Sequence, residues 1–238
     1  MNIDILAFGA HPDDVEISCG GTLLRYADEG KQIAIVDLTQ GELGTRGSGA
    51  LRMEECKAAS QILGLVDRVN LGMADGFFEE NEDHLHQIIR EIRHFRPKLI
   101  FANSIRDRHP DHGRAAALVA RAAFLSGLPK INTERNGISQ EAYRAPMLLH
   151  YIQDIYIEPD VVLDVSAYAE EKIKLVQCFA SQFFDPNSTE PETPISNAHF
   201  FEFMKGRMLQ FGRPIGAKYA EGFTVNRTLG VSDLFHLI

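Results

Sequence analysis

The chain has 238 residues, 45% of them hydrophobic, and its formal net charge is -9. A chain of this length and apolar content can form one α/β domain with a sizeable core. Its acidic balance argues against a large polyanionic partner such as a nucleic acid, because binding to phosphates requires a basic surface.

The first half of the chain alternates short apolar runs with amphipathic segments of helical length, which is typical of βαβ units and a parallel sheet. In chain order the expected elements are strand 3–9, helix 20–29, strand 32–39, helix 50–63, strand 68–71, helix 84–95, strand 98–103 and helix 113–125. A Gly-rich loop at 41–49 follows the second strand.

The pattern is looser beyond Leu128. Strands are expected at 147–152 and 161–165, helices at 167–179 and 198–211, and an irregular segment at the C-terminus. No internal repeat or linker is evident, so we expect residues 1–238 to form a single domain. The predicted fold is Rossmann-like α/β, with a mostly parallel sheet, helices on both faces and a C-terminal elaboration.

The cysteines and the apolar segments indicate the cellular compartment in which the protein is expected. Cys19, Cys56 and Cys178 are far apart and form no CxxC pair, so we expect neither a disulfide framework nor a thiolate metal site. The chain starts without a basic leader region, and no apolar run approaches the ~20 residues needed to span a bilayer. We therefore expect a cytoplasmic protein without a membrane partner.

The first chemical motif is His11-Pro12-Asp13-Asp14, directly after the first expected strand. In a parallel sheet, the loops at the carboxyl ends of the strands form the ligand crevice. A dinucleotide site is excluded here, because the G-x-G-x-x-G turn is missing and two carboxylates would repel a pyrophosphate.

The second motif, at residues 106–112, follows the fourth strand of the predicted sheet and ends in His109-Pro110-Asp111-His112. It should lie at the same sheet edge as the first motif. One such motif alone would usually be a turn or a helix cap, but two after buried strands favour a metal site. Imidazole and carboxylate groups are the ligands of catalytic zinc, which keeps one position open for water. Two His and one Asp would leave the ion a positive charge that acidifies this water.

These motifs, in this order and separation, resemble those of the LmbE/PIG-L family of zinc-dependent N-acetylglucosaminyl deacetylases. The similarity extends to the loop 41–47, the helix start at 52–55 and the segment 219–223. The resemblance implies that His11, Asp14 and His112 bind the metal. Zn²⁺ is the expected ion, although Fe²⁺ suits the same ligands.

The resemblance also implies the catalytic roles. Asp13 would be the general base that takes a proton from the attacking water. A protonated His109 would stabilise the oxyanion or protonate the leaving amine, and Asp111 would orient His109. The chemistry is consistent with this, because amide hydrolysis needs a polarising metal, a base and an acid together. Asp13 and its neighbour Asp14 cannot easily bind one ion together, so one base and one ligand is the natural division.

Within the family, the chain is most similar to the compact deacetylases of bacillithiol biosynthesis, which act on N-acetylglucosaminyl-malate and release acetate. Malate carries two carboxylates, so this substrate requires cations near the metal. The candidates for substrate binding are Arg46 and Arg52, with Arg106 and Arg108 as further cations. His199, where relatives often carry Tyr, could donate a hydrogen bond to the substrate. Relatives of this type are commonly hexameric, so a homo-oligomer, with the hexamer as one form, is expected.

Two alternatives stay open, and a third lacks the sequence signal that it requires. The substrate could be another N-acetylglucosamine conjugate, of inositol or of a chitooligosaccharide. A metal-dependent phosphoesterase would use similar ligands but usually assembles two metals with more carboxylates. A nucleotide-binding module lacks its Gly-rich fingerprint. The other histidines are expected to be structural or surface residues: His84, His86, His94, His150 and His236.

Overall fold

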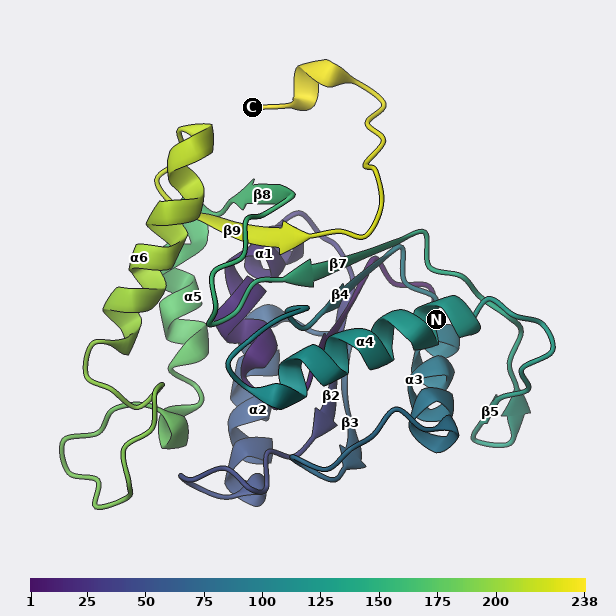
Figure 1. Ribbon diagram of the computed structural model, residues 1–238, viewed down its shortest axis with the longest axis horizontal. Coiled ribbons are helices and arrows are strands. Elements are labelled where there is room, and N and C mark those ends of the chain that lie inside the picture. The colour runs from purple at the N-terminus through teal and green to yellow at the C-terminus, as the bar shows by residue number, and fades with distance from the viewer.

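The computed structural model describes residues 1–238 apart from the side chain of His236, so the prediction for that side chain lies outside the described residues. Most of the chain surrounds one sheet, and the C-terminal segment loops away from it (Figure 1). None of the helices in the described part combines the length and apolar character that a membrane crossing requires.

Seven strands form this sheet, in the order β3-β2-β1-β4-β7-β9-β8. Their bounds are β1 Ile5–Gly9, β2 Ile33–Thr39, β3 Asp67–Met73, β4 Leu99–Ala102, β7 Met147–Tyr151, β8 Val161–Asp164 and β9 Ala220–Thr224. The five strands from β3 to β7 pair in parallel, and β9 runs antiparallel between β7 and β8. Every residue of β1 and β2 is buried, which explains why both strands are mostly apolar, with Asp37 and Thr39 as the polar residues of β2.

Helices cover both faces of the sheet and divide the core into two main layers. Their bounds are α1 Asp14–Asp28, α2 Gly49–Leu63, α3 Glu82–Phe95, α4 Pro110–Leu125, α5 Ala169–Val176 and α6 Phe200–Gly212. Leu6 and Phe8 of β1 pack with α3 and α4, whereas Ile5 and Ala7 pack with α1, α2 and α5. A small hairpin, β5 Glu134–Arg135 and β6 Ile138–Ser139, lies apart from the main sheet. The predicted mostly parallel α/β fold is confirmed.

The C-terminal segment differs from the prediction, because β9 is a strand inside the sheet rather than an irregular tail. A charged residue and a glycine, Glu221 and Gly222, interrupt its apolar pattern and hide the strand in the sequence. Gly222 is required by packing, since a Cβ atom there would lie 3.0 Å from the ring of Phe211.

Two helices begin three or more residues earlier than expected, and this determines where the motifs lie. α1 starts at Asp14, and α4 starts at Pro110 with His109 as its N-cap. Proline is well suited to a first helical position because its fixed φ is helical and no intrahelical partner exists for an N–H there. Both motifs therefore stand at helix N-termini beyond the carboxyl ends of the adjacent strands β1 and β4.

Candidate active site

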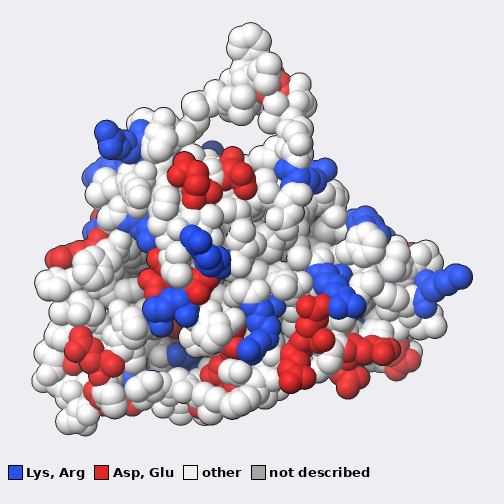
Figure 2. Space-filling model, in the orientation of Figure 1, with Lys and Arg blue, Asp and Glu red and all other residues white. Residues whose placement is uncertain are grey.

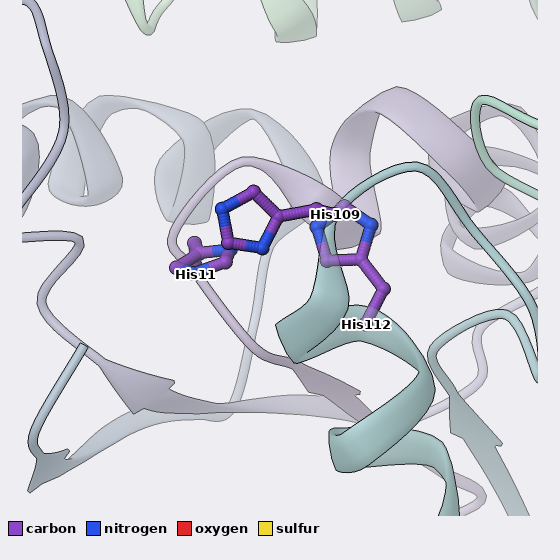
Figure 3. Close-up of side chains that lie close together, drawn as sticks. All are labelled: His11, His109 and His112. Atoms are coloured by element: carbon purple, nitrogen blue, oxygen red, sulfur yellow. The ribbon is translucent and has the colours of Figure 1, made fainter. Parts of the chain in front are cut away.

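Three histidines from the two motifs converge at this sheet edge (Figure 3). The ring of His11 meets that of His109 edge-on at 4.7 Å between centroids, and His109 stacks on His112 at 5.1 Å. One nitrogen from each ring lies within 4.8 Å of the others, so these residues could hold a metal ion. The sequence prediction that both motifs contribute to one site is consistent with this geometry.

Asp14 lies against two of these rings. Its Oδ1 atom is 3.1 Å from Nε2 of His112, and its Oδ2 atom is 3.6 Å from Nδ1 of His11. Amide groups of Asn103 and Gln153 donate to the same carboxylate. Burial acts to raise the pKa of Asp14, but the charge of His112 and hydrogen bonds from both histidines hold it well below its usual range. Two imidazoles and an ionised carboxylate are a donor set that fits a divalent transition-metal ion.

Two further aspartates bind the outer nitrogens of the same rings. Oδ1 of Asp75 is 3.0 Å from Nε2 of His11, and Asp107 is hydrogen-bonded to Nδ1 of His112. Metal-binding histidines usually donate a hydrogen bond from their second ring nitrogen to a carboxylate, and this bond fixes the tautomer and the ring orientation. Nδ1 of His11 and Nε2 of His112 are therefore the nitrogens left to face Asp14.

Asp75 was not among the predicted site residues, although one signal could have identified it. It follows β3, which is parallel to β2, so its position after a strand end matches that of both motifs. Its Oδ2 atom accepts the N–H of Leu43, and its own N–H donates to Glu42, which ties the Gly-rich loop to this edge.

Asp13 is buried, and its Oδ2 atom has no hydrogen-bond partner among the described residues. Its φ of 112° is in the left-handed region, which a side chain other than glycine rarely adopts. Such strain is concentrated at functional sites. Burial raises the pKa of Asp13 to about 7, although the charge of Arg52 lowers it and that of Asp14 raises it. This carboxylate is therefore able to accept a proton near neutral pH.

His109 differs from the expectation. Its Nδ1 atom accepts the backbone N–H of Asp111 at 3.3 Å. The Asp111 carboxylate instead accepts from Gly76 and Arg114, and within the described residues it forms no hydrogen bond with the His109 ring. Burial lowers the pKa of His109, and the charge of His11 lowers it further, which outweighs the opposite effect of Asp111. The expectation of a protonated His109 is therefore contradicted in direction, because these effects favour the neutral ring.

A cavity of about 630 Å³ opens in front of these residues. Arg52 lines it and donates to the side chain of Gln182, while Arg108 lines it beside Asp154. Arg46 is buried but lies outside the lining formed by the described residues.

Two other residues with predicted substrate contacts lie away from this cavity. Arg106 is exposed and is not part of the described lining. The exposed ring of His199 is also outside the lining and pairs with Glu202 at 3.1 Å. The structure instead brings Arg207 of α6 to the cavity, which the sequence did not single out.

The sequence model of the GlcNAc-PI de-N-acetylase family, PIG-L, matches residues 6–124, which include both motifs. The chain belongs to the PIG-L family. As a PIG-L family enzyme, it is a metal-dependent N-acetylglucosaminyl deacetylase. The predicted family is thus confirmed.

Two relatives and one solved structure resemble three quarters or more of the chain. Diacetylchitobiose deacetylase of Thermococcus kodakarensis is 26% identical, over 98% of this chain and 88% of that protein. The probable N-acetyl-alpha-D-glucosaminyl L-malate deacetylase 2 of Bacillus anthracis is 29% identical, over 75% of this chain and 81% of that protein. The crystal structure of the conserved protein TT1542 from Thermus thermophilus superposes with a TM-score of 0.85 at 33% identity, over 97% of this chain and 98% of that one.

Proposed function

We propose that this enzyme hydrolyses the acetamide of an N-acetylglucosamine conjugate at the site where the two motifs meet. The observation that carries the proposal is the pair Asp13 and Asp14. Asp14 lies ionised against two histidines, whereas Asp13 lines the same cavity and has a buried oxygen with no hydrogen-bond partner among the described residues. A ligand and a base side by side are what metal-assisted amide hydrolysis requires.

We assign the metal to His11, Asp14 and His112, with Zn²⁺ as the proposed ion and Fe²⁺ as the other ion that suits these ligands. The hydrogen bonds of Asp75 and Asp107 support this assignment, because they leave the Asp14-facing nitrogens free. When bound, such an ion polarises the acetamide carbonyl and acidifies a water molecule.

The protein groups then move the protons. Asp13 accepts a proton from the attacking water and returns it to the nitrogen of the breaking C–N bond, which releases acetate and the free amine. The neutral His109 ring carries its proton on Nε2, because Nδ1 accepts the Asp111 N–H. This Nε2–H donates to the carbonyl oxygen as negative charge develops there. Asp111 acts through its backbone on His109, while its carboxylate lies 3.4 Å from Nε2 of His11.

The finer proposals concern the substrate and the assembly. The malate conjugate of bacillithiol biosynthesis is the candidate from the sequence, and the Bacillus anthracis relative supports it. Diacetylchitobiose is the second candidate, supported by the Thermococcus relative. We also propose that residues 1–238 work as one domain, since the cavity lining runs from His11 to Glu221. We further propose that the chain assembles into a homo-oligomer, such as a hexamer.

The test is acetate release measured by mass spectrometry on purified protein. The substrates are the malate conjugate, diacetylchitobiose and N-acetylglucosaminyl-inositol, each with and without a chelator. We expect turnover of at least one of them that stops on chelation and returns with added Zn²⁺. Equal turnover in chelator-treated protein would contradict the metal-dependent mechanism, and no acetate from any substrate would contradict the proposed reaction.

A further inference from the structure

The segment that follows β7 contacts two of the carboxylates at the metal site. Gln153 lies just beyond the end of β7, and its Nε2 atom donates to Oδ1 of Asp14 at 3.0 Å. The next two backbone N–H groups donate to Oδ1 of Asp107 at 3.1 and 2.8 Å. Asp14 is an assigned metal ligand, and Asp107 is hydrogen-bonded to the ring of His112, which is another. Three consecutive residues therefore support two of the three ligands.

Asp14, Gln153 and Asn103 form a closed triangle of hydrogen bonds. Asn103 follows β4 and is buried, and its Nδ2 atom donates to Oδ2 of Asp14 at 3.0 Å and to Oε1 of Gln153 at 2.9 Å. An ionised carboxylate only accepts hydrogen bonds, so each amide must turn its NH₂ group toward Asp14. The triangle fixes the orientation of the Asp14 carboxylate, and Asn103 in turn holds the Gln153 side chain in place.

Arg207 of α6 binds the backbone of the same segment. Its Nη1 atom donates to the carbonyl oxygen of Gln153 at 3.1 Å, and its Nη2 atom donates to that of Asp154 at 2.9 Å. The guanidinium group also lies over the rings of Tyr156 and Phe211, at 5.7 and 5.8 Å from their centroids. A planar fork of donors is well suited to two neighbouring oxygens. Through this segment, α6 is connected to Asp14 and to the partner of His112.

The charge of Arg207 and its hydrogen bonds have opposite effects on metal binding. Basic and acidic side chains are interspersed over the face drawn in Figure 2. Arg207 forms no ion pair among the described residues, and the carboxylate of Asp154 pairs with Arg108 instead. A cation near a metal ion repels it, so loss of the charge alone would strengthen metal binding. Loss of the two hydrogen bonds would weaken metal binding, because the segment would no longer be held against the ligands.

We propose that Gln153 and Arg207 are positioning residues of the metal site. Gln153 orients the Asp14 carboxylate, and Arg207 holds the backbone segment that binds both Asp14 and Asp107. The inference rests on the proposed function, because that proposal assigns the ligands. Groups that orient metal ligands contribute about 10–100-fold to metal affinity. Both residues lie outside residues 6–124, which the family model matches, so the two motifs alone do not complete the site.

The test is the affinity of the full chain for Zn²⁺, measured by competition with a chromogenic chelator. Gln153→Met keeps the length of the side chain but donates no hydrogen bond, so it should weaken binding by about 10–100-fold. Arg207→Met should weaken it by about tenfold, the lower end of that range. Arg207→Lys keeps the charge but lacks the fork, so its affinity should lie between those of Arg207→Met and the unmodified protein.

Two matched controls lie outside the described cavity lining. Gln140 and Arg90 each donate to a backbone oxygen, as Arg207 does, and neither contacts the metal site. Gln140→Met and Arg90→Met should leave the affinity for Zn²⁺ unchanged. Urea denaturation of the metal-free variants measures the free energy of unfolding. A purely structural role of Gln153 or Arg207 would lower this free energy and leave the metal affinity as it is.

Two further measurements test how these residues act. Arg207→Met should weaken metal binding by a smaller factor in Asp107→Asn than in the unmodified protein, because residues of one hydrogen-bond network are not additive. The absorption spectrum of bound Co²⁺ depends on the coordination geometry, so the spectrum of Gln153→Met should differ from that of the unmodified protein.

Unchanged or stronger metal binding in Arg207→Met would overturn its positioning role. An unchanged affinity together with an unchanged Co²⁺ spectrum in Gln153→Met would overturn that of Gln153. Metal-dependent acetate release by a protein whose variants all keep full affinity contradicts this inference alone. A chain that binds no metal contradicts the proposed function as well.

Discussion

At the scale of single residues, the neighbours Asp13 and Asp14 are made different by their partners. Asp14 has two histidines and two amides around it, and the charges and hydrogen bonds of the histidines hold its pKa well below the usual range. Asp13 has a buried oxygen without a hydrogen-bond partner in the described part of the chain, and burial raises its pKa to about 7. We therefore propose that the same type of side chain serves as an ionised ligand in one position and as a proton acceptor in the next.

These different roles predict that two variants lose activity in different ways, one with its metal retained and one with its metal lost. Asp13→Asn should retain the metal and lose about 10²–10⁴-fold in kcat, since that is the usual contribution of a general base. Asp14→Asn should lose the metal as well as turnover. Elemental analysis and kcat are the measurements. Metal loss in Asp13→Asn with full metal in Asp14→Asn would mean that the two roles are exchanged.

The carboxylates of Asp75 and Asp107, which are hydrogen-bonded to His11 and His112, should affect metal affinity. Asp107→Asn and Asp75→Asn should weaken metal binding by about 10–100-fold, because the rings of His112 and His11 lose the groups that orient them. Competition with a chromogenic chelator measures this affinity. Asp154→Asn is the control, because Asp154 pairs with Arg108 instead of a histidine. Equal affinity in all of these variants would contradict an orienting role.

The pH dependence of activity follows from Asp13. Only its carboxylate form accepts a proton, so kcat/KM should rise with pH through about 7 and then level off. The charge of Arg52 lowers this pKa, so Arg52→Met should move the rise to higher pH. Arg108→Met should leave its position unchanged. A rise that stays in place in Arg52→Met would show that another group titrates.

At the scale of elements, the sequence predicted the parts whose structure is determined locally. Mostly apolar runs predicted β1, β2 and β4, and the motifs after β1 and β4 predicted the site edge. Asp75 was missed because its partner His11 is 64 positions away in the sequence. The contribution of α6 to the cavity and the strand β9 were missed for a similar reason, since their places depend on long-range packing that no local pattern contains.

The element α1 shows one such long-range dependence. Its backbone departs from helical geometry at Cys19, with φ at -132°. The N–H groups of Gly21 and Thr22 donate to the carboxylate of Glu221 in β9, at 2.9 and 2.7 Å. The ammonium group of Lys172 in α5 neutralises this carboxylate at 2.6 Å. Three elements thus meet at one buried ion pair.

Removal of this carboxylate should destabilise the protein strongly. Glu221→Gln leaves the buried Lys172 charge without compensation, and breaking a buried pair in this way costs about 3–5 kcal/mol. Urea denaturation measures the free energy of unfolding. The control is Glu202→Gln on the surface of α6, which should change it by less than about 0.5 kcal/mol. A similar small change in Glu221→Gln would contradict a structural role for the pair.

At the scale of the whole molecule, residues from the N-terminal and C-terminal parts of the chain line the same cavity. The motifs near the N-terminus supply the metal-binding end, and α6 and β9 near the C-terminus supply the opposite wall. The family match covers residues 6–124 and therefore both motifs, while the wall that would contact an aglycone lies outside that range. Substrate choice is for this reason harder to predict from the sequence than the reaction.

Metal binding should also change how stability depends on pH. Burial lowers the pKa of His112, but the charge of Asp14 and the hydrogen bond to Asp107 raise it to about 9, above its ordinary value of 6.5. In metal-free protein this histidine adds stability that is fully present below pH 6.5 and is lost as the pH rises toward 9. The metal requires the deprotonated ring, so its binding becomes stronger over the same range.

The difference in Tm between metal-loaded and chelated protein should therefore widen from pH 6.5 to pH 9, as scanning calorimetry can measure. His112→Gln removes both the ligand and the titrating group, so its Tm should respond little to chelation at either pH. His199→Gln, at an exposed ring outside the described cavity lining, should behave as the unmodified protein does. A difference in Tm that stays constant with pH would contradict the assignment of His112 as a ligand, because a ligand cannot bind a proton and the metal at the same nitrogen.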